Sequence, residues 1–234
     1  MADRTNYNFS YSNLRAQLRI DLPVMFAAAG TGLTATTNNG TVTLSIYSPP
    51  SISSFVNDHS VVEIGSTVTS TVLTWVLTGG AITSQSLDNS IGSLSTSLRS
   101  YTNISSYANN RTYTLSISDG TTSPTATSSV LFEHQRYWGV GASSGPSDAN
   151  LIASSSEFAT SRVKGAFSIS PAAQYVWFAY PASFGAASFT VNGLLNTAWT
   201  LTTRNLVNAS GNTTSYNVYV SNTVLTGTYT LTVN

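Results

Sequence analysis

Tyr113-Thr-Leu-Ser-Ile-Ser-Asp-Gly120 is the stretch of the 234-residue sequence that decides the fold. Its apolar residues alternate with Ser and Thr, which is the period of a β-strand with one buried face. Asp119-Gly120 follows as a turn, because both residue types tolerate positive φ. Thr125 to Phe132 then returns as the partner strand, so this stretch predicts a β-hairpin.

Further strands are expected between residues 51 and 112. Val61 to Gly65 and Val72 to Leu77 have the composition of strands, and Trp75 is predicted to anchor the core. Turn residues such as Gly79-Gly80 and Asn109-Asn110 separate the strands at short intervals, which leaves no room for βαβ crossovers. Residues 51–134 are therefore predicted to form a small β-sandwich of the immunoglobulin-like type.

Composition favours β-structure along the whole chain. Charged residues make up 8% of the sequence, against about 25% in a typical soluble domain, so Ser, Thr and Asn must supply the polar surface. The nine Lys and Arg residues balance the nine Asp and Glu residues, and the cations form no cluster that would bind a nucleic-acid backbone. The sequence contains no run of about 20 apolar residues, so no membrane span is predicted. Neither nucleic acid nor a spanned membrane is an expected partner.

Cysteine is absent, which excludes disulfides, thiolate catalysis and Cys-ligated zinc. Small extracellular β-domains often carry disulfides, so folding in a reducing cytoplasm is favoured. Leu22 to Gly30 resembles the apolar part of a signal peptide, but it follows a polar leader and has Asp21 at its edge. The alternative of a secreted bacterial adhesin requires this segment to be a cleaved signal.

Residues 1–50 are predicted to form an N-terminal attachment arm. Leu14 and Leu18 lie four residues apart in a stretch that favours a two-turn helix, and such a short helix needs a partner to pack against. Together with Phe26 they are the candidate residues for docking on a neighbouring subunit. The alternative is an ordered strand or tail on the same molecule. Pro49-Pro50 marks a stiff boundary before the central domain.

Residues 135–234 are predicted to form a second β-domain. Tyr175 to Tyr180 is a nearly continuous apolar run, as expected of a strand covered on both faces. Leu151 to Lys164 is expected to hold the only helical turn of this half. Tyr137 and Trp138 lie between the two domains and are the candidate hinge-packing residues. The predicted fold class is all-β, with an N-terminal arm followed by two β-sandwich domains.

Several motifs resemble a module of tailed-bacteriophage structural proteins, and the resemblance covers about residues 55–234. In the central domain and the junction that follows it they are Val61-Val-Glu-Ile-Gly65, Trp75, Gln85-Ser-Leu87, Ser100-Tyr101, Tyr113 to Gly120 and Arg136-Tyr-Trp-Gly139. In the second half they are Tyr175 to Pro181, Phe184-Gly185, Tyr216 to Tyr219 and Gly227.

The resemblance implies assembly or attachment, since no catalytic residue and no cofactor come with this module. The expected protein is a non-enzymatic component of a bacteriophage virion, synthesised in the host cytoplasm. Its arm is expected to dock on tail, neck or capsid while the β-domains project outward or seal a seam. Other virion proteins are the expected partners, and homo-oligomers are expected because such particles are symmetric.

Catalytic, cofactor and metal sites are not predicted. Asp58-His59-Ser60 contains the residue types of a hydrolase triad, but adjacent residues do not create the geometry of a triad. Asp119-Gly120 lacks the several carboxylates that calcium requires. Three scattered acids contain no evident glycosidase pair; they are Glu133, Asp148 and Glu157. Asn-X-Ser/Thr triplets such as those at Asn103 and Asn208 are expected from composition alone.

Aromatic residues gather in the second half of the chain, and core packing accounts for most of them. They include Tyr137, Trp138, Trp177, Tyr180, Phe184 and Trp199. The alternative is a surface patch that contacts a neighbouring subunit or stacks on sugar rings. A receptor- or glycan-binding fibre tip, with a host-surface glycan as its partner, is therefore the alternative function.

Overall fold

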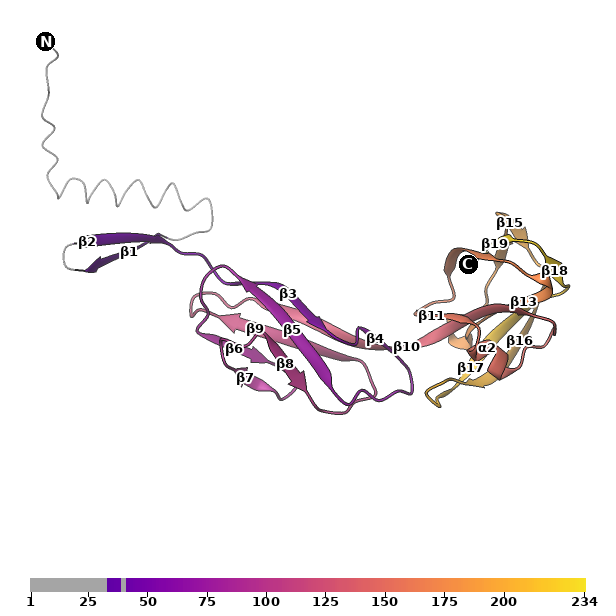
Figure 1. Ribbon diagram of the computed structural model, residues 1–234, viewed down its shortest axis with the longest axis horizontal. Coiled ribbons are helices and arrows are strands. Elements are labelled where there is room, and N and C mark those ends of the chain that lie inside the picture. The colour runs from indigo at the N-terminus through magenta and orange to yellow at the C-terminus, as the bar shows by residue number, and fades with distance from the viewer. Residues whose placement is uncertain (1–32, 39–40) are drawn as a thin grey trace, which may run out of the picture. The chain divides into compact units, whose positions relative to one another are not determined.

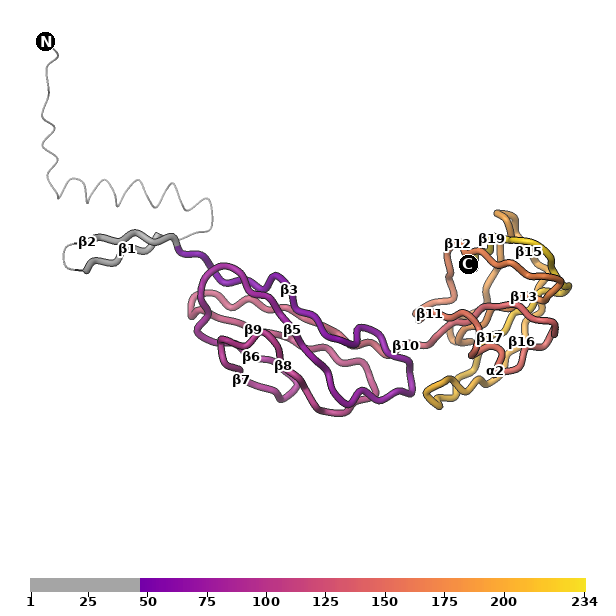
Figure 2. Tube along the Cα trace, in the orientation of Figure 1, coloured from indigo at the N-terminus to yellow at the C-terminus, as the bar shows by residue number. Residues whose placement is uncertain are grey.

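The computed structural model describes residues 33–38 and 41–234, with side chains from residue 47 onward, and this part of the chain is almost entirely β-structure (Figure 1). It divides into two compact units, each built from several segments of the chain. Figure 2 traces the chain through these segments in order. Unit 1 contains residues up to Val56, Leu73–Tyr101 and Tyr113–Ser128. Unit 2 contains Asn57–Val72, Thr102–Thr112 and Ser129–Asn234. The predicted division into segments 1–50, 51–134 and 135–234 stays a prediction.

Eight strands that begin between residues 51 and 125 form two sheets. The first sheet has the order β3 (Ser51–Asn57), β5 (Thr71–Thr78) and β8 (Ser100–Asn103). The second has the order β4 (Val61–Glu63), β10 (Thr125–Gly141), β9 (Arg111–Ser118), β6 (Ser84–Leu87) and β7 (Gly92–Leu94).

This strand order is that of an immunoglobulin-like sandwich. Immunoglobulin domains place strands A, B and E in one sheet and strands C, F and G in the other. The first sheet here supplies β3, β5 and β8 in the places of A, B and E, and the second supplies β6, β9 and β10 in the places of C, F and G. β4 continues the first strand into the second sheet, where it pairs parallel with β10. The prediction of an immunoglobulin-like β-sandwich is confirmed.

Leucines occupy the core of the sandwich where antibody domains carry a disulfide. Leu73 on β5 and Leu115 on β9 are fully buried. Leu115 follows the buried Tyr113 by two residues, which is the spacing between the conserved Tyr and the second Cys of antibody domains. Trp75 is also buried and meets Phe55 edge-on at 6.3 Å, so its predicted place in the core is confirmed.

The predicted turn at Asp119-Gly120 is present, and Gly120 has a φ of 92°. One carboxylate oxygen of Asp119 accepts the amides of Thr121 and Thr122 at 2.8 and 2.7 Å. The other accepts the Tyr47 hydroxyl at 2.5 Å. Hydrogen bonds from the Thr122 amide, the Tyr47 hydroxyl and the Thr121 amide lower the pKa of Asp119 to about 2.

Asp119 is therefore expected to make the stability of the protein pH-dependent. Because its pKa is lowered in the folded state, the contribution of Asp119 is complete above its ordinary value of 3.8 and is lost as the pH falls to about 2. Thermal melts of the wild type and Asp119→Asn between pH 5 and pH 2 test this. The wild type should lose more stability than the variant over this range, and parallel curves would contradict the assignment.

The part of unit 2 from His134 to Asn234 is called the C-terminal domain below. Two layers of strands pack face to face in it, and the first of them continues the sheet of β10. The first has the order β16 (Trp199–Val207), β17 (Thr213–Ser221), β13 (Ala172–Pro181), the end of β10, and β11 (Ser155–Ala159). The second has the order β12 (Lys164–Ile169), β19 (Tyr229–Val233), β14 (Phe189–Val191) and β15 (Leu194–Asn196). Shorter elements are α2 (Asp148–Ile152), η1 (Ala182–Phe184) and β18 (Leu225–Thr226).

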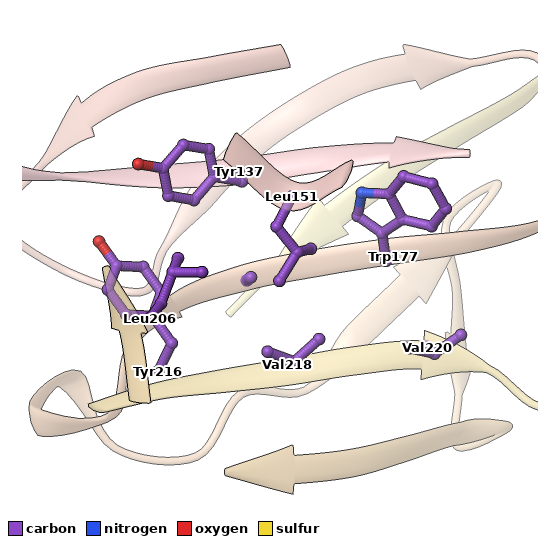
Figure 3. Packing of buried hydrophobic residues seen from close by; sticks show 8 residues of the cluster. Tyr137, Leu151, Trp177, Leu206, Tyr216, Val218 and Val220 are labelled. Carbon is purple, nitrogen blue, oxygen red and sulfur yellow. The ribbon is translucent and has the colours of Figure 1, made fainter. Parts of the chain in front are cut away.

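β13 is covered on both faces, as its continuous apolar sequence predicts. On one face, Trp177 packs with Leu151 of α2 and with Val218 and Val220 of β17 (Figure 3). On the other face, Phe178 meets the second sheet, where it packs against residues of β14 and β19. The domain is therefore a β-sandwich with one short helix on its outer side.

The helical turn expected within Leu151 to Lys164 lies earlier in the chain. α2 starts at Asp148, because the Ser147 hydroxyl accepts the Asn150 amide at 3.2 Å and caps the helix. The following residues pair with β10 as β11. The prediction was wrong in its extent, because the helix is capped by Ser147 and ends at Ile152, and the chain is extended from Ser155.

A separate β-hairpin precedes the sandwich. β1 (Leu33–Asn38) and β2 (Thr41–Ile46) pair antiparallel in a two-stranded sheet. This hairpin falls inside the predicted attachment arm. The candidate docking residues Leu14, Leu18 and Phe26 lie outside the described residues.

Candidate functional site

Polar side chains connect β4 of the sandwich with the turn between β16 and β17, and all of them belong to unit 2. The Asn208 side-chain amide donates to the Ile64 carbonyl at 2.7 Å. The Ser210 hydroxyl donates to Glu63 Oε2 at 2.7 Å, and it also lies 2.7 Å from the Ser66 hydroxyl. These five residues are called the β4–turn contact below. It joins segments about 144 residues apart in the sequence.

The turn is pre-organised for this contact. The Asn208 amide donates to the Asn212 carbonyl at 2.9 Å, and the Asn212 amide donates back to the Asn208 side chain at 2.8 Å. On the other side, Gly65 has a φ of 99°, and a Cβ there would lie 2.6 Å from Asn212 Cβ. Glycine alone adopts this positive φ readily and leaves space for Asn212. The glycine at position 65 therefore allows the turn to lie close to it.

Glu63 is a buried carboxylate with one oxygen left over. Its Oε2 is satisfied by Ser210, whereas Oε1 has no hydrogen-bond partner among the described residues. Burial, and then the negative charge of Glu63, raises the pKa of Tyr137 to about 12. Burial lowers the pKa of His134, and the charge of Glu63 opposes that shift. The tyrosine therefore stays neutral beside the carboxylate, and this arrangement suits a structural contact rather than proton transfer.

Ser210→Ala is expected to lower the free energy of unfolding by about 1–3 kcal/mol, because it leaves the buried Glu63 carboxylate without its donor. Thr213→Ala is the matched control, since Thr213 lies three residues on and is exposed. Its effect should stay within about 0.5 kcal/mol. Urea denaturation followed by circular dichroism measures both variants, and equal effects would contradict the role given to Ser210.

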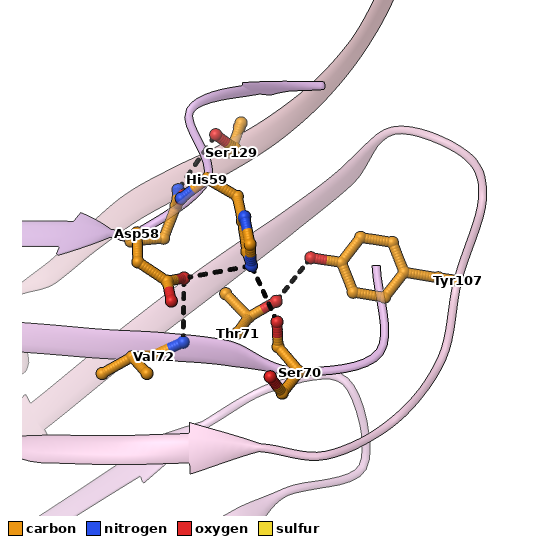
Figure 4. Close-up of polar contacts among 8 residues, drawn as sticks. Asp58, His59, Ser70, Thr71, Val72, Tyr107 and Ser129 are labelled. Atoms are coloured by element: carbon orange, nitrogen blue, oxygen red, sulfur yellow. Dashed lines mark hydrogen bonds and ion pairs between the residues drawn. The ribbon is translucent and has the colours of Figure 1, made fainter. Parts of the chain in front are cut away.

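The triad residue types at Asp58-His59-Ser60 do not form a triad. His59 Nε2 lies 2.9 Å from the Ser70 carbonyl and 3.6 Å from Asp58 Oδ1, so both contacts use the same ring nitrogen (Figure 4). Asp58 also accepts the Val72 amide at 2.9 Å. A triad needs the nucleophile and the orienting acid on opposite ring nitrogens. These residues instead hold the loop before β4 against the start of β5.

Two of the three scattered acids are held in ion pairs. Glu157 bonds to both Arg136 and Lys164, and Asp148 lies 3.1 Å from Arg204. Burial acts to raise the pKa of Glu157, but hydrogen bonds from Lys164 and Arg136 outweigh it, so this pKa lies below its ordinary value. A glycosidase acid needs a raised pKa, so Glu157 does not suit that role.

The described residues contain no group of three or more His, Cys, Asp or Glu that would hold a metal ion. Within the same part of the chain, no helix is long and apolar enough to span a membrane.

Tyr137 and Trp138 lie on opposite faces of β10, inside the C-terminal domain. Tyr137 is 1% exposed and packs among Leu151, Leu206 and Tyr216. Trp138 is partly buried against Phe167 of β12, and the Lys164 ammonium lies 3.9 Å from its ring centre. Both residues thus belong to the two cores of this domain. Their role in fixing a hinge stays a prediction.

The aromatic cluster of the second half is turned inward. Tyr137, Trp177 and Tyr180 are buried, while Trp138, Phe184 and Trp199 are partly buried within the same clusters. None of the six is exposed. The large apolar residues that do face solvent in this domain include Leu194 and Leu195, which are 75% and 70% exposed.

Sequence reasoning missed the β4–turn contact. Asn208 and Ser210 occur in an Asn-X-Ser triplet, a pattern that composition alone explains. Asn208 is in fact buried and bonded to Ile64, and Asn103 is buried and accepts the Ser105 amide. The one local signal was Gly211, which has a φ of 81° and marks the tight turn.

Comparisons with known proteins add little to this description. No family model matches the sequence, and no curated protein matches it. Among solved structures, Sidekick-1 immunoglobulin domains 1–5 are similar at 11% identity and a TM-score of 0.31, over 85% of this chain and 41% of that chain. The chimeric titin Z1Z2 structure is similar at 13% identity and a TM-score of 0.28, over 80% of this chain and 91% of that chain.

The N-terminal eight Ig domains of DSCAM are similar at 12% identity and a TM-score of 0.27, over 82% of this chain. The present chain spans 26% of that structure. The immunoglobulin-like assignment rests on the strand order described above. That fold hosts many functions, and it is typical of non-enzymatic binding and structural modules.

Proposed function

We propose that this chain is a non-enzymatic structural component of a bacteriophage virion. Its arm, residues 1–50, docks on tail, neck or capsid, and its two β-domains project outward or seal a seam. Other virion proteins are the partners and the virion is the location. The virion assignment is supported by the resemblance of the motifs in residues 55–234 to tailed-bacteriophage structural proteins.

The observation that carries a structural role is the continuity of β10. This strand is 17 residues long. Its Leu131–Glu133 segment pairs with β4 in the sandwich, and residues from His134 onward pair with β11 and β13 in the C-terminal domain. The two segments are thus joined by a continuous paired strand, whereas a Gly/Ser linker would be a flexible coil. The β4–turn contact adds side-chain bonds beside it.

The inward-facing aromatics weigh against the alternative of a glycan-binding fibre tip. Stacking on sugar rings requires exposed aromatic faces. The six aromatics considered for this role are buried or partly buried in the described part of the chain. A structural component needs no such surface.

Mass spectrometry of purified, salt-washed particles from the source tests the proposal, followed by cryo-electron microscopy of the same particles. The chain should be present in a fixed number of copies, with residues 1–50 in contact with another virion protein. Absence of the chain from washed particles would overturn the proposal. Binding of the full chain to a glycan array would then favour the fibre-tip function.

A further inference from the structure

We propose that the β1–β2 hairpin of one copy of this chain pairs along the free edge of β16 in a second copy. The inference rests on the proposed function, because it names a partner for the attachment arm. It is drawn from two elements of the same chain, each of which has an unpaired edge within the described residues.

The β1–β2 hairpin is incomplete as a sheet. Within the described residues, β1 and β2 pair with each other and with no third strand. Their register pairs Leu33 with Ile46 and Asn38 with Thr41, so both strands are paired along their whole length. An isolated two-stranded hairpin is marginally stable in water, and a further strand or a packed helix stabilises it. A strand of a second copy would supply such a neighbour.

β16 offers the complementary feature. It is the outermost strand of its sheet, and all nine of its residues pair with β17. No strand of the described chain pairs with its other edge. Four consecutive residues, Thr200 to Thr203, are exposed, so this part of the strand is open to solvent. At ~3.4 Å per residue, the edge presents about 30 Å of unpaired N–H and C=O groups.

The other edges of this domain are less suited to pairing. β15 has three residues, which is too short for more than one or two hydrogen bonds. β12 has a register shift between Lys164 and Phe167, and such irregularities protect an edge against pairing. β16 has no such shift, no Pro and no Lys. It is the longest unprotected edge of the domain.

Charge does not oppose the contact. No charged residue occurs between Asp21 and Asp58, a stretch that includes the whole hairpin. Arg204 is the only charged residue of β16, and it is ion-paired with Asp148. Pairing of an added strand relies on main-chain hydrogen bonds, which need no charged groups. Both surfaces are present in every copy, so a second copy is the occupant that we infer.

The resulting contact is heterologous, because it joins two different surfaces of the same chain. Repeated from copy to copy, a heterologous contact closes into a ring or continues as a filament. Either form gives a symmetric assembly in which each copy provides one hairpin and one edge.

The absence of cysteine makes cross-linking a direct test. Thr36→Cys and Thr43→Cys place thiols on the two hairpin strands, and Thr202→Cys places one on β16. Single-cysteine variants of the full chain are mixed and treated with a short bis-maleimide, which tolerates an unknown register. Hairpin variants mixed with Thr202→Cys should give a covalent dimer. Thr121→Cys, on the exposed turn after β9, replaces Thr202→Cys in the control mixture and should give none.

Two outcomes would overturn the inference. One is a yield with Thr202→Cys no higher than with Thr121→Cys. The other is equal cross-linking of Thr202→Cys alone, which would mean that β16 pairs with itself. The test uses purified chain without particles, so the inference can fail while mass spectrometry still finds the chain in virions. Conversely, the purified chain can cross-link as expected while mass spectrometry finds no copy of it in virions.

A second measurement addresses the edge itself. Thr200→Lys/Thr202→Lys adds two charges to β16, and Thr121→Lys/Thr223→Lys adds two charges at exposed positions elsewhere. Edge lysines block strand pairing. Sedimentation equilibrium of the full chain should show loss of the oligomer for the first variant and its retention for the second, with unchanged circular dichroism in both. Equal association of the two variants would overturn the inference.

Discussion

Tyr137→Ala is expected to lower the free energy of unfolding by about 3–5 kcal/mol, the range observed when a fully buried aromatic side chain is removed. Tyr137 is 1% exposed and packs among Leu151, Leu206 and Tyr216. Its ring centre lies 5.9 Å from that of Tyr216. The space left by the ring is bounded by β16 and β17 and by Leu151 of α2, so collapse around it is restricted and most of the loss should remain.

Tyr137→Phe is the matched control, and it should lose much less stability than Tyr137→Ala. The Tyr137 hydroxyl is buried, and its interaction with the Glu63 carboxylate contributes to its raised pKa. Its removal gives up at most one polar contact, worth about 1–3 kcal/mol, while the ring stays in place. Urea denaturation of the three proteins measures the difference. A loss in Tyr137→Phe as large as that in Tyr137→Ala would mean that the hydroxyl, not the ring, stabilises the fold.

The two variants also bear on the predicted hinge role of Tyr137. The sequence placed this residue between two domains, because it follows the last residue of the predicted sandwich closely. The structure places its side chain in the core of the C-terminal domain. A large effect of Tyr137→Ala is thus expected from core packing alone. A separate hinge effect would require a change in the sandwich as well.

Local patterns predicted most of the fold. The alternation in Tyr113 to Gly120 identified β9 and its turn, and the continuous apolar run at Tyr175 to Tyr180 identified a strand buried on both faces. Both patterns reflect the period of the strand and the number of its covered faces, which are properties of neighbouring residues. Trp75 was placed in the core for the same reason.

Contacts between distant residues could not be predicted in this way. Asn208 meets Ile64 across 144 positions, and neither residue has a local pattern that points to the other. The start of α2 was missed because a capping contact from Ser147 decides it. The position of β16 at the edge of its sheet could not be predicted either, because an edge strand and a central strand of an antiparallel sheet can have the same sequence pattern. Sheet order is a property of the whole domain.

The second large loss of stability is expected on truncation of the leucine core of the sandwich. Without a disulfide between the sheets, packing at Leu73 and Leu115 must supply the stabilisation that a covalent bond supplies in antibody domains. Leu73→Ala is therefore expected to lower the free energy of unfolding by about 2–5 kcal/mol. Val76→Ala is the control on the same strand. Val76 is 54% exposed, so its truncation should cost no more than about 0.5 kcal/mol.

The tryptophans allow this loss to be assigned to one domain. Trp75 is the only tryptophan of the sandwich, and the other three, Trp138, Trp177 and Trp199, lie in the C-terminal domain. In a urea titration followed by the indole N–H signals of nitrogen-15-labelled protein, Leu73→Ala should shift the Trp75 transition to lower urea. If the other three signals shift equally, β10 and the β4–turn contact make the two domains unfold together. If Trp75 does not shift, Leu73 is not the core residue that the immunoglobulin-like strand order makes it.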